Sequence, residues 1–212
     1  MTLINVIFAS IALTLPAVSH APEGWLAMAD RLIRQPITGC ANVMTEPVSG
    51  LDQDGYGLSA WSVAFAMMAL NVLYETTGER AYLDGGVRVA TSLMDVRDHR
   101  LAERYGPDRY TDYLRGRVMK AWGTGHYDKG NHTCYVVHQG MLLYPIAELV
   151  RLIRSGGRAT AILRRTADEL ERQVREVIAE IEPNWRNGPH AGMGYYVSPV
   201  GRVSPNNYQT AM

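Results

Sequence analysis

The fold is decided by residues 60–96, which read AWSVAFAMMALNVLYETTGERAYLDGGVRVATSLMDV. The first part, 60–73, is apolar except for Ser62 and Asn71, and a helix that is apolar all round is buried on all sides. After Gly78, the apolar residues recur at steps of four, three and four among charged ones: Leu83, Val87, Ala90 and Met94. That spacing predicts a helix with one buried stripe and one solvated face. The stretch therefore predicts a helical hairpin with a buried first helix, a half-exposed second helix and Gly78 as the C-cap between them.

The same pair recurs about 78 residues later. Residues 134–153 are mostly apolar, and Ser155-Gly156-Gly157 breaks the run. Apolar residues then step by four and three along a second charged helix: Leu163, Ala167, Leu170, Val174, Val177 and Ile181. A repeat with a buried helix needs neighbours that cover it, which a ring of inner helices sheathed by outer helices or a linear solenoid can supply. Solenoid repeats usually run to about 35–45 residues, so the longer spacing favours the ring, and the chain is predicted to be all-α.

Composition and the N-terminus limit the classes of function. The 212 residues are 47% hydrophobic and 20% charged, with 21 acidic and 21 basic residues, which predicts one globular domain and gives no support for nucleic-acid binding. Residues 1–21 form an uncharged apolar run that ends at Ser19-His20-Ala21, the pattern of a secretory signal. The alternative is a buried or membrane-anchoring helix. We expect a secreted or periplasmic protein with its domain at 22–212, and no later run long enough to span a membrane.

The hairpin carries a family resemblance. Residues 61–83, with Leu-Tyr-Glu-Thr-Thr-Gly closing the first helix and Tyr-Leu opening the second, resemble the repeat of the α/α-toroid, or six-hairpin glycosidase-like, carbohydrate-active proteins. Residues 137–141 and 206–212 look like the starts of further inner helices. The resemblance covers about residues 55–212 and implies an α/α toroid that this chain leaves incomplete, together with glycan processing. Self-association is then expected as one way to complete the ring.

The densest polar cluster lies at residues 125–135, with His138 close behind, where a long loop meets the second buried helix. Asn131-His132 followed by Tyr135 resembles the Asn-His motif of toroid polysaccharide lyases, which implies β-elimination on a uronate-containing polysaccharide. Asn131 would bind the substrate carboxylate, His132 or Tyr135 would abstract the proton α to it, and a tyrosine would protonate the leaving oxygen. The candidate catalytic residues are Asn131, His132, Tyr135, His138 and Asp128.

Other interpretations of these residues stay open. Asn131 can instead cap a helix, with the histidines packed beside it. Glycoside hydrolysis would need two carboxylates, for which Asp52, Asp54 and Asp128 are available, and a non-catalytic glycan-binding toroid would need neither. No cofactor is expected, and no metal, because histidines at i and i+4 are absent.

Aromatic and amide side chains supply candidates for substrate binding, because aromatic faces stack on sugars. They are Tyr56, Trp122, Trp185, Tyr195, Gln139 and Asn207, whereas Trp61 is expected in the core. The linking residues 100–131 and 182–205 read as long loops, in which 195–197 and 199–203 could form a hairpin. Cys40 and Cys134 could form a disulfide or remain buried thiols.

Overall fold

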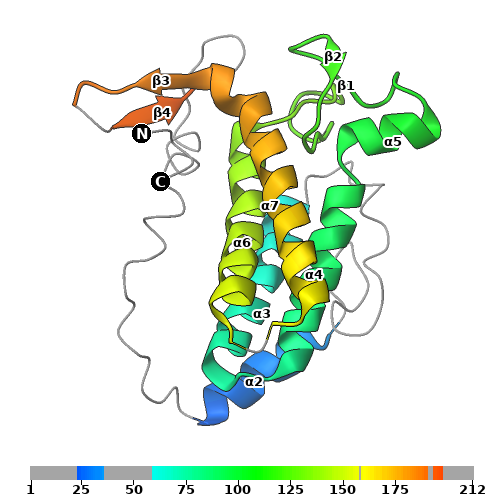
Figure 1. The fold of residues 1–212 in the computed structure, drawn as a ribbon. Coiled ribbons are helices and arrows are strands. Elements are labelled where there is room, and N and C mark those ends of the chain that lie inside the picture. Colours follow the sequence, from blue (N-terminus) through cyan, green and yellow to red (C-terminus); the bar gives the residue numbers. More distant parts are fainter. Residues whose placement is uncertain (1–22, 36–58, 158, 191–192, 198–212) are drawn as a thin grey trace.

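The computed structural model describes residues 23–35, 59–157, 159–190 and 193–197, and these residues are mostly helical (Figure 1). The helices are α2 (Glu23–Ile33), α3 (Ala64–Thr77), α4 (Arg80–Asp95), α5 (Asp98–Tyr105), α6 (Val136–Ser155) and α7 (Ala161–Ile181). A π-helical turn, η2 (Ser59–Val63), precedes α3, and a 3-10 turn, η3 (Glu182–Asn184), follows α7. Two antiparallel pairs of short strands complete the described part: β1 (Thr111–Asp112) with β2 (Arg117–Val118), and β3 (Trp185–Asn187) with β4 (Gly194–Tyr196). The prediction of an all-α protein is confirmed at this level.

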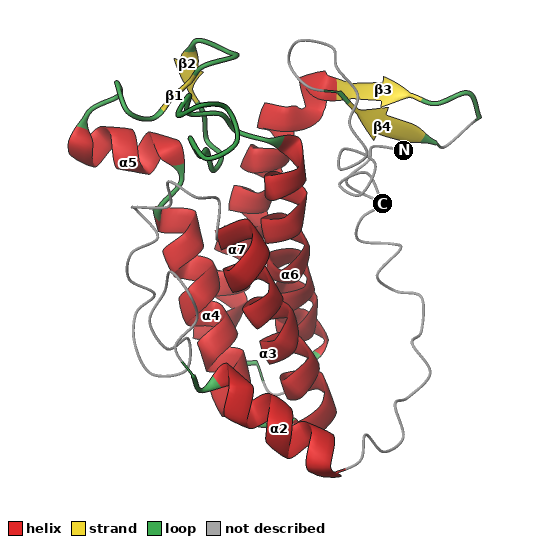
Figure 2. Cartoon of the chain, turned by 180° about the vertical axis from the view of Figure 1, so that it is seen from behind, coloured by secondary structure: helices red, strands yellow, loops and turns green. Residues whose placement is uncertain are grey.

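Both predicted hairpins are present and pack against each other. The helices α3 and α4 form one hairpin, α6 and α7 form the other, and α3 packs on α6. Figures 1 and 2 show α3, α4, α6 and α7 side by side, with α2 crossing one end and the strands and α5 at the other. We call this second end the loop end. Because α3 and α6 both begin at the loop end, the residues at their N-termini lie beside the long connecting segments.

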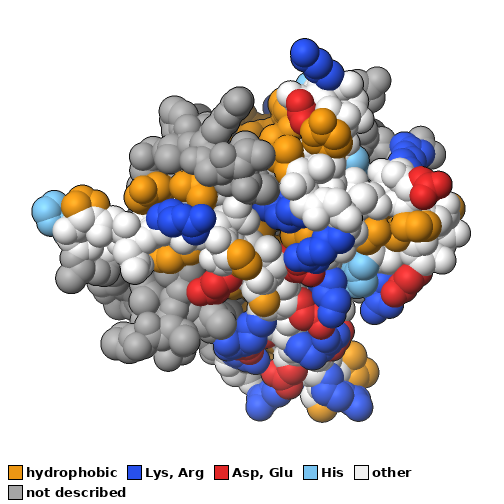
Figure 3. Space-filling model, turned by 90° about the horizontal axis from the view of Figure 1, so that it is seen from above, with side chains coloured by type: hydrophobic (Ala, Val, Ile, Leu, Met, Phe, Trp, Pro, Cys, Tyr) orange, Lys and Arg blue, Asp and Glu red, His pale blue; other side chains and the backbone are white. Residues whose placement is uncertain are grey.

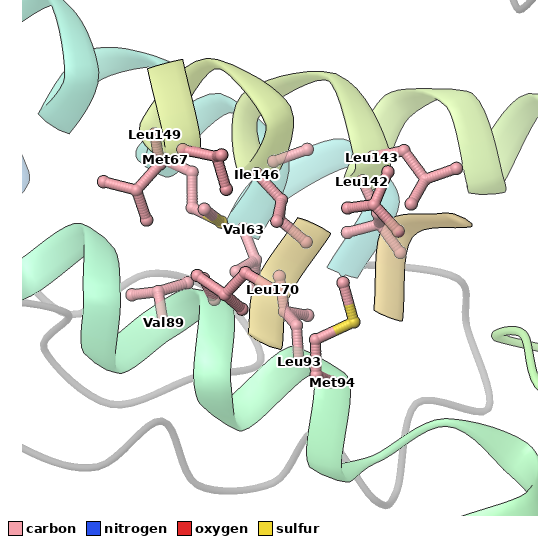
Figure 4. Close-up of a cluster of buried hydrophobic side chains, with 14 of the residues drawn as sticks. Val63, Met67, Val89, Leu93, Met94, Leu142, Leu143, Ile146, Leu149 and Leu170 are labelled. Carbon is pink, nitrogen blue, oxygen red and sulfur yellow. The ribbon is translucent and has the colours of Figure 1, made fainter. Parts of the chain in front are cut away.

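The core fills the space between these four helices (Figure 4). Met67 of α3, Leu93 of α4 and Ile146 of α6 are fully buried in one cluster with Leu170 of α7. Truncating such a side chain to alanine costs about 2–5 kcal/mol. The helices also approach closely, since a Cβ atom on Gly86 of α4 would lie 3.1 Å from Leu149 Cδ1 of α6.

The two hairpin turns differ although their first helices end 78 residues apart, at Thr77 and Ser155. Gly78 has φ 70° at the C-cap of α3, and its N–H donates to Tyr74 O, so the left-handed backbone explains the glycine. Gly156 has φ −74°, and α7 begins after the N-cap Thr160, whose side chain accepts from Leu163 N. The repeat is therefore preserved in the helices and not in the connection.

Two sequence-based expectations need correction, and a third concerns residues that are only partly described. The segment 100–131 is not structureless, because it contains most of α5 and the β1–β2 pair. The strand at 194–196 pairs with 185–187, and its predicted partner 199–203 lies outside the described residues. The helix α6 has 20 residues and meets the length and hydropathy of a membrane span, so the expectation that this run is too short was wrong; 72% of its apolar window is buried inside the protein.

Several predictions concern residues outside the described ranges. They are the signal sequence at 1–21, Cys40, Asp52, Asp54, Tyr56, and the helix start that includes Asn207.

Candidate functional site

The described candidates for catalysis all lie at the loop end. Asp128, Asn131, His132 and Tyr135 belong to the segment before α6, and His138 lies in the first turn of α6. The last part of this segment is extended: Thr133 forms an antiparallel bridge with Thr124, and Tyr135 has φ −74° and ψ 134°. Successive side chains of an extended segment point to opposite sides. The structure therefore separates His132 from Tyr135 instead of joining them in one constellation.

On one side, the side chains of His132 and Cys134 meet the buried carboxylate of Asp98, the first residue of α5. His132 Nε2 lies 2.9 Å from Asp98 Oδ2, and Cys134 Sγ donates to the same oxygen over 3.1 Å. The backbone N–H of Gly123 donates to Asp98 Oδ1 over 3.1 Å. The carboxylate thus accepts from two donors and lies within hydrogen-bond distance of a nitrogen of His132.

The imidazole of His132 is held by packing as well as by this contact. Tyr110 meets it edge-on, with ring centroids 6.0 Å apart, and a Cβ atom on Gly123 would lie 2.1 Å from Nε2. The side chain is still 17% exposed. Within the described part of the chain, Nδ1 of His132 has no hydrogen-bond partner, so a base nitrogen remains available at this position.

Cys134 is a buried free thiol in the structure, and its predicted disulfide partner Cys40 lies outside the described residues. Burial, and then the negative charge of Asp98, raises the pKa of the Cys134 thiol well above its usual value. The thiol consequently stays protonated and serves as a donor, which argues against a nucleophilic role.

A second buried carboxylate, Asp112, fixes the same segment. It accepts from the Cys134 N–H over 2.7 Å, from the Arg115 N–H over 2.7 Å, and from the Arg115 guanidinium over 2.9 Å. Arg115 also donates to Asn184 Oδ1, and the Asn184 amide donates to Val197 O. These bonds tie the loop before α6 to the end of α7 and to the β3–β4 hairpin, so His132 sits on a rigid support.

On the other side lies an aromatic cluster made of Trp61, Tyr127, Tyr135 and His138. Neighbouring rings meet edge to face with centroids 5.3–5.7 Å apart, and Trp61 Nε1 donates to Tyr127 Oη over 2.9 Å. Rings at this separation are in direct contact, so a ligand would meet the outer surface of the cluster, where Tyr127 is 50% exposed. Burial, and then the charge of Asp128, raises the pKa of Tyr135, so its phenol keeps the proton.

Two of the predicted substrate-binding residues lie in the core instead. The amide of Gln139 is fully buried and bonds to the backbone: Oε1 accepts from Trp122 N over 3.0 Å, and Nε2 donates to Trp122 O over 2.8 Å and to Tyr135 O over 2.9 Å. The indole of Trp122 is also buried and donates to Leu93 O over 2.8 Å. The expectation that Trp122 and Gln139 contact substrate is therefore corrected, because their polar atoms are already bonded inside the protein.

Trp185 and Tyr195 lie on the β3–β4 hairpin, away from the aromatic cluster along the loop end (Figure 1). The ring of Trp185 packs against Tyr196 at 5.0 Å and covers Gly194, where a Cβ atom would lie 1.8 Å from the indole. Both Trp185 and Tyr195 are half-buried, so they form a separate surface.

The charge of the loop end is mixed. Figure 3 shows acidic and basic side chains interspersed on this face, with apolar side chains between them. Among the described residues, no group of three or more His, Cys, Asp and Glu side chains is placed to hold a metal ion.

The chain matches no protein-family model, no curated protein and no solved structure. The function is therefore inferred from the chemistry of the site.

Asp98, Asp112 and Arg115 were not identified from the sequence. The contact between Asp98 and His132 joins residues 34 positions apart, and no local motif marks it.

Proposed function

We propose that this protein cleaves an acidic, uronate-containing polysaccharide by β-elimination at the loop end, with His132 as the base. The observation that supports this most is the contact of His132 Nε2 with the buried Asp98, which leaves Nδ1 as the nitrogen that faces a substrate. A histidine oriented by a carboxylate is a recurrent arrangement for proton abstraction.

The chemistry requires few groups. His132 takes the proton α to the substrate carboxylate, the carbon–oxygen bond at the β carbon breaks, and a double bond forms between the two carbons. The leaving oxygen needs a proton, which His132 can return when both events occur on the same face of the sugar. Asn131, which is half-buried and precedes His132 in the sequence, is the proposed donor of an amide hydrogen bond to the substrate carboxylate as charge develops there.

The aromatic cluster has a different role in this proposal. Because Tyr135 lies on the other side of the extended segment, we assign it to sugar binding together with the exposed ring of Tyr127, while the buried His138 packs against both rings. The raised pKa of Tyr135 keeps its phenol available as a hydrogen-bond donor.

The finer fold assignment belongs to the same proposal. Two hairpins whose first helices, α3 and α6, pack together and begin at the same end support part of an α/α toroid of the six-hairpin kind. A second copy of the chain would be one means of completing the ring. Secretion or periplasmic location follows from the apolar, uncharged residues 1–21.

A non-catalytic glycan-binding role is the second candidate, supported by the separation of the aromatic cluster from His132. Hydrolysis has less support, because Asp98 of α5 and Asp112 of β1 are buried and bonded to neighbouring donors.

The test is incubation of the purified protein with a panel of acidic polysaccharides, followed by ultraviolet absorbance of the conjugated double bond. We expect absorbance to rise with the wild type, to be lost in His132→Ala and to persist in His190→Ala, a matched change at an exposed turn. New reducing ends without absorbance would show hydrolysis, and retained binding without any product would show the binding module; either result contradicts elimination.

A further inference from the structure

The environment of Asp98 combines three features: it is buried, it accepts hydrogen bonds from Gly123 N–H and the Cys134 thiol, and it lies within hydrogen-bond distance of Nε2 of the proposed base. We infer that Asp98 is the positioning residue that fixes the tautomer of His132, holding the proton on Nε2 and leaving the lone pair on Nδ1. The role of His132 as a base rests on the proposed function, whereas the position of its proton follows from the contacts alone.

The direction of the hydrogen bond follows from the other partners of Asp98. The Gly123 N–H can only donate, and the Cys134 thiol is kept protonated by its environment, so both treat Asp98 as an acceptor. A carboxylate that accepts these two bonds is suited to accept the third from His132 Nε2–H. In a neutral imidazole the proton then sits on Nε2, and Nδ1 is the acceptor.

The surroundings keep this geometry from relaxing. Gly123 leaves no room behind the ring, because a Cβ atom there would lie 2.1 Å from His132 Nε2 and 2.7 Å from Asp98 Oδ2. The start of α5 is held in turn by the bond from Asp98 N to Ala121 O over 2.8 Å. The carboxylate and the imidazole are therefore positioned by backbone on both sides.

The change that tests the inference is Asp98→Asn, which keeps the shape of the side chain. An asparagine that accepts from Gly123 with its oxygen presents its NH₂ group to Nε2, and Nε2 must then carry the lone pair. The proton moves to Nδ1, and His132 loses the base that faces substrate. With turnover assayed by double-bond absorbance, we expect kcat to fall by at least about a hundredfold with little change in KM. Asp84→Asn is the matched control and should leave turnover unchanged, because Asp84 is a partly exposed carboxylate near the start of α4, and α4 begins at the end opposite the loop end.

The tautomer is read directly by nitrogen NMR on the full-length protein labelled at histidine. The signals of His132 are assigned among the six histidines with His132→Ala. The inference predicts a protonated Nε2 and an unprotonated Nδ1 in the wild type, and the reverse pattern in Asp98→Asn. A wild-type His132 protonated on Nδ1, or a wild-type pattern that survives in a folded Asp98→Asn, would overturn it.

Failure of the proposed elimination and failure of the positioning role of Asp98 give different results. If no polysaccharide yields an unsaturated product with the wild type, the proposed function fails, and the NMR result still decides whether Asp98 sets the tautomer. If the product forms and Asp98→Asn turns it over at the wild-type rate, positioning of the base is refuted. Should Asp98→Asn fail to fold, the wild-type tautomer alone supports or overturns the inference.

Discussion

Replacing Gln139 with methionine separates a structural role from a substrate-binding role at this position. In the structure, the Gln139 amide satisfies both the N–H and the C=O of Trp122 in a fully buried position. Gln139→Met keeps much of the side-chain volume but removes these two bonds and the one to Tyr135 O. Each buried backbone group left without a partner costs about 1–3 kcal/mol, and the added apolar burial offsets part of that. The expected loss is about 3 kcal/mol of unfolding free energy, or about 6–12 °C in Tm for a chain of this size.

The assay is equilibrium chemical denaturation of the wild type and Gln139→Met. The control is Gln173→Met on α7, a half-buried glutamine whose exposed side-chain bond to Glu169 bridges one helical turn. Its replacement should change the unfolding free energy by no more than about 0.5 kcal/mol. Unchanged stability in Gln139→Met together with weakened glycan binding would refute the structural role and restore Gln139 as a ligand residue.

Three further predictions concern acid stability and the loop end. Burial lowers the pKa of His99 from 6.5 to about 4, so the unfolded chain takes up the proton first; stability is retained above about pH 6.5 and falls as the pH drops toward 4. His99→Gln should lose less stability over that window in denaturation series, and an equally steep loss would contradict the assignment. Gly123→Ala should displace His132 and change its NMR signals, because the new Cβ would lie 2.1 Å from Nε2; unchanged signals would refute the packing. Tyr127→Phe removes the acceptor of the Trp61 N–H and should cost about 1 kcal/mol or less by denaturation, because the bond is exposed; a loss above about 3 kcal/mol would show that the cluster is part of the core.

The helical hairpins could be predicted because their information is local. The nearly continuous apolar run of α3 encodes a helix buried on most sides. The steps of three and four along α4 and α7 encode helices with one buried face. Gly78 marked the end of α3 correctly, since only the left-handed C-cap requires a glycine there.

The site was harder to predict because its contacts are distant in sequence. Asn131-His132 and Tyr135 form one short motif, but the extended backbone sends His132 and Tyr135 to opposite sides. The partner of His132 is Asp98, which nothing local distinguishes from the other acidic residues.

The aromatic residues show the same limit. Trp122 was expected to bind substrate because it is aromatic, whereas its indole fills the core. Gly123 beside it is explained by the close approach of His132 and Asp98. The strand pairing of 185–187 with 194–196 depends on Gly194 making room for Trp185, a contact that no alternation pattern encodes.

The most direct test of the central claim is the mass of the product formed from an acidic oligosaccharide in heavy-oxygen water. Elimination by His132 predicts a new non-reducing end that is one water lighter than a hydrolysis product, with no solvent oxygen incorporated by the wild type and no product from His132→Ala. Solvent oxygen in the product, or an unsaturated product of undiminished yield from His132→Ala, would contradict the account.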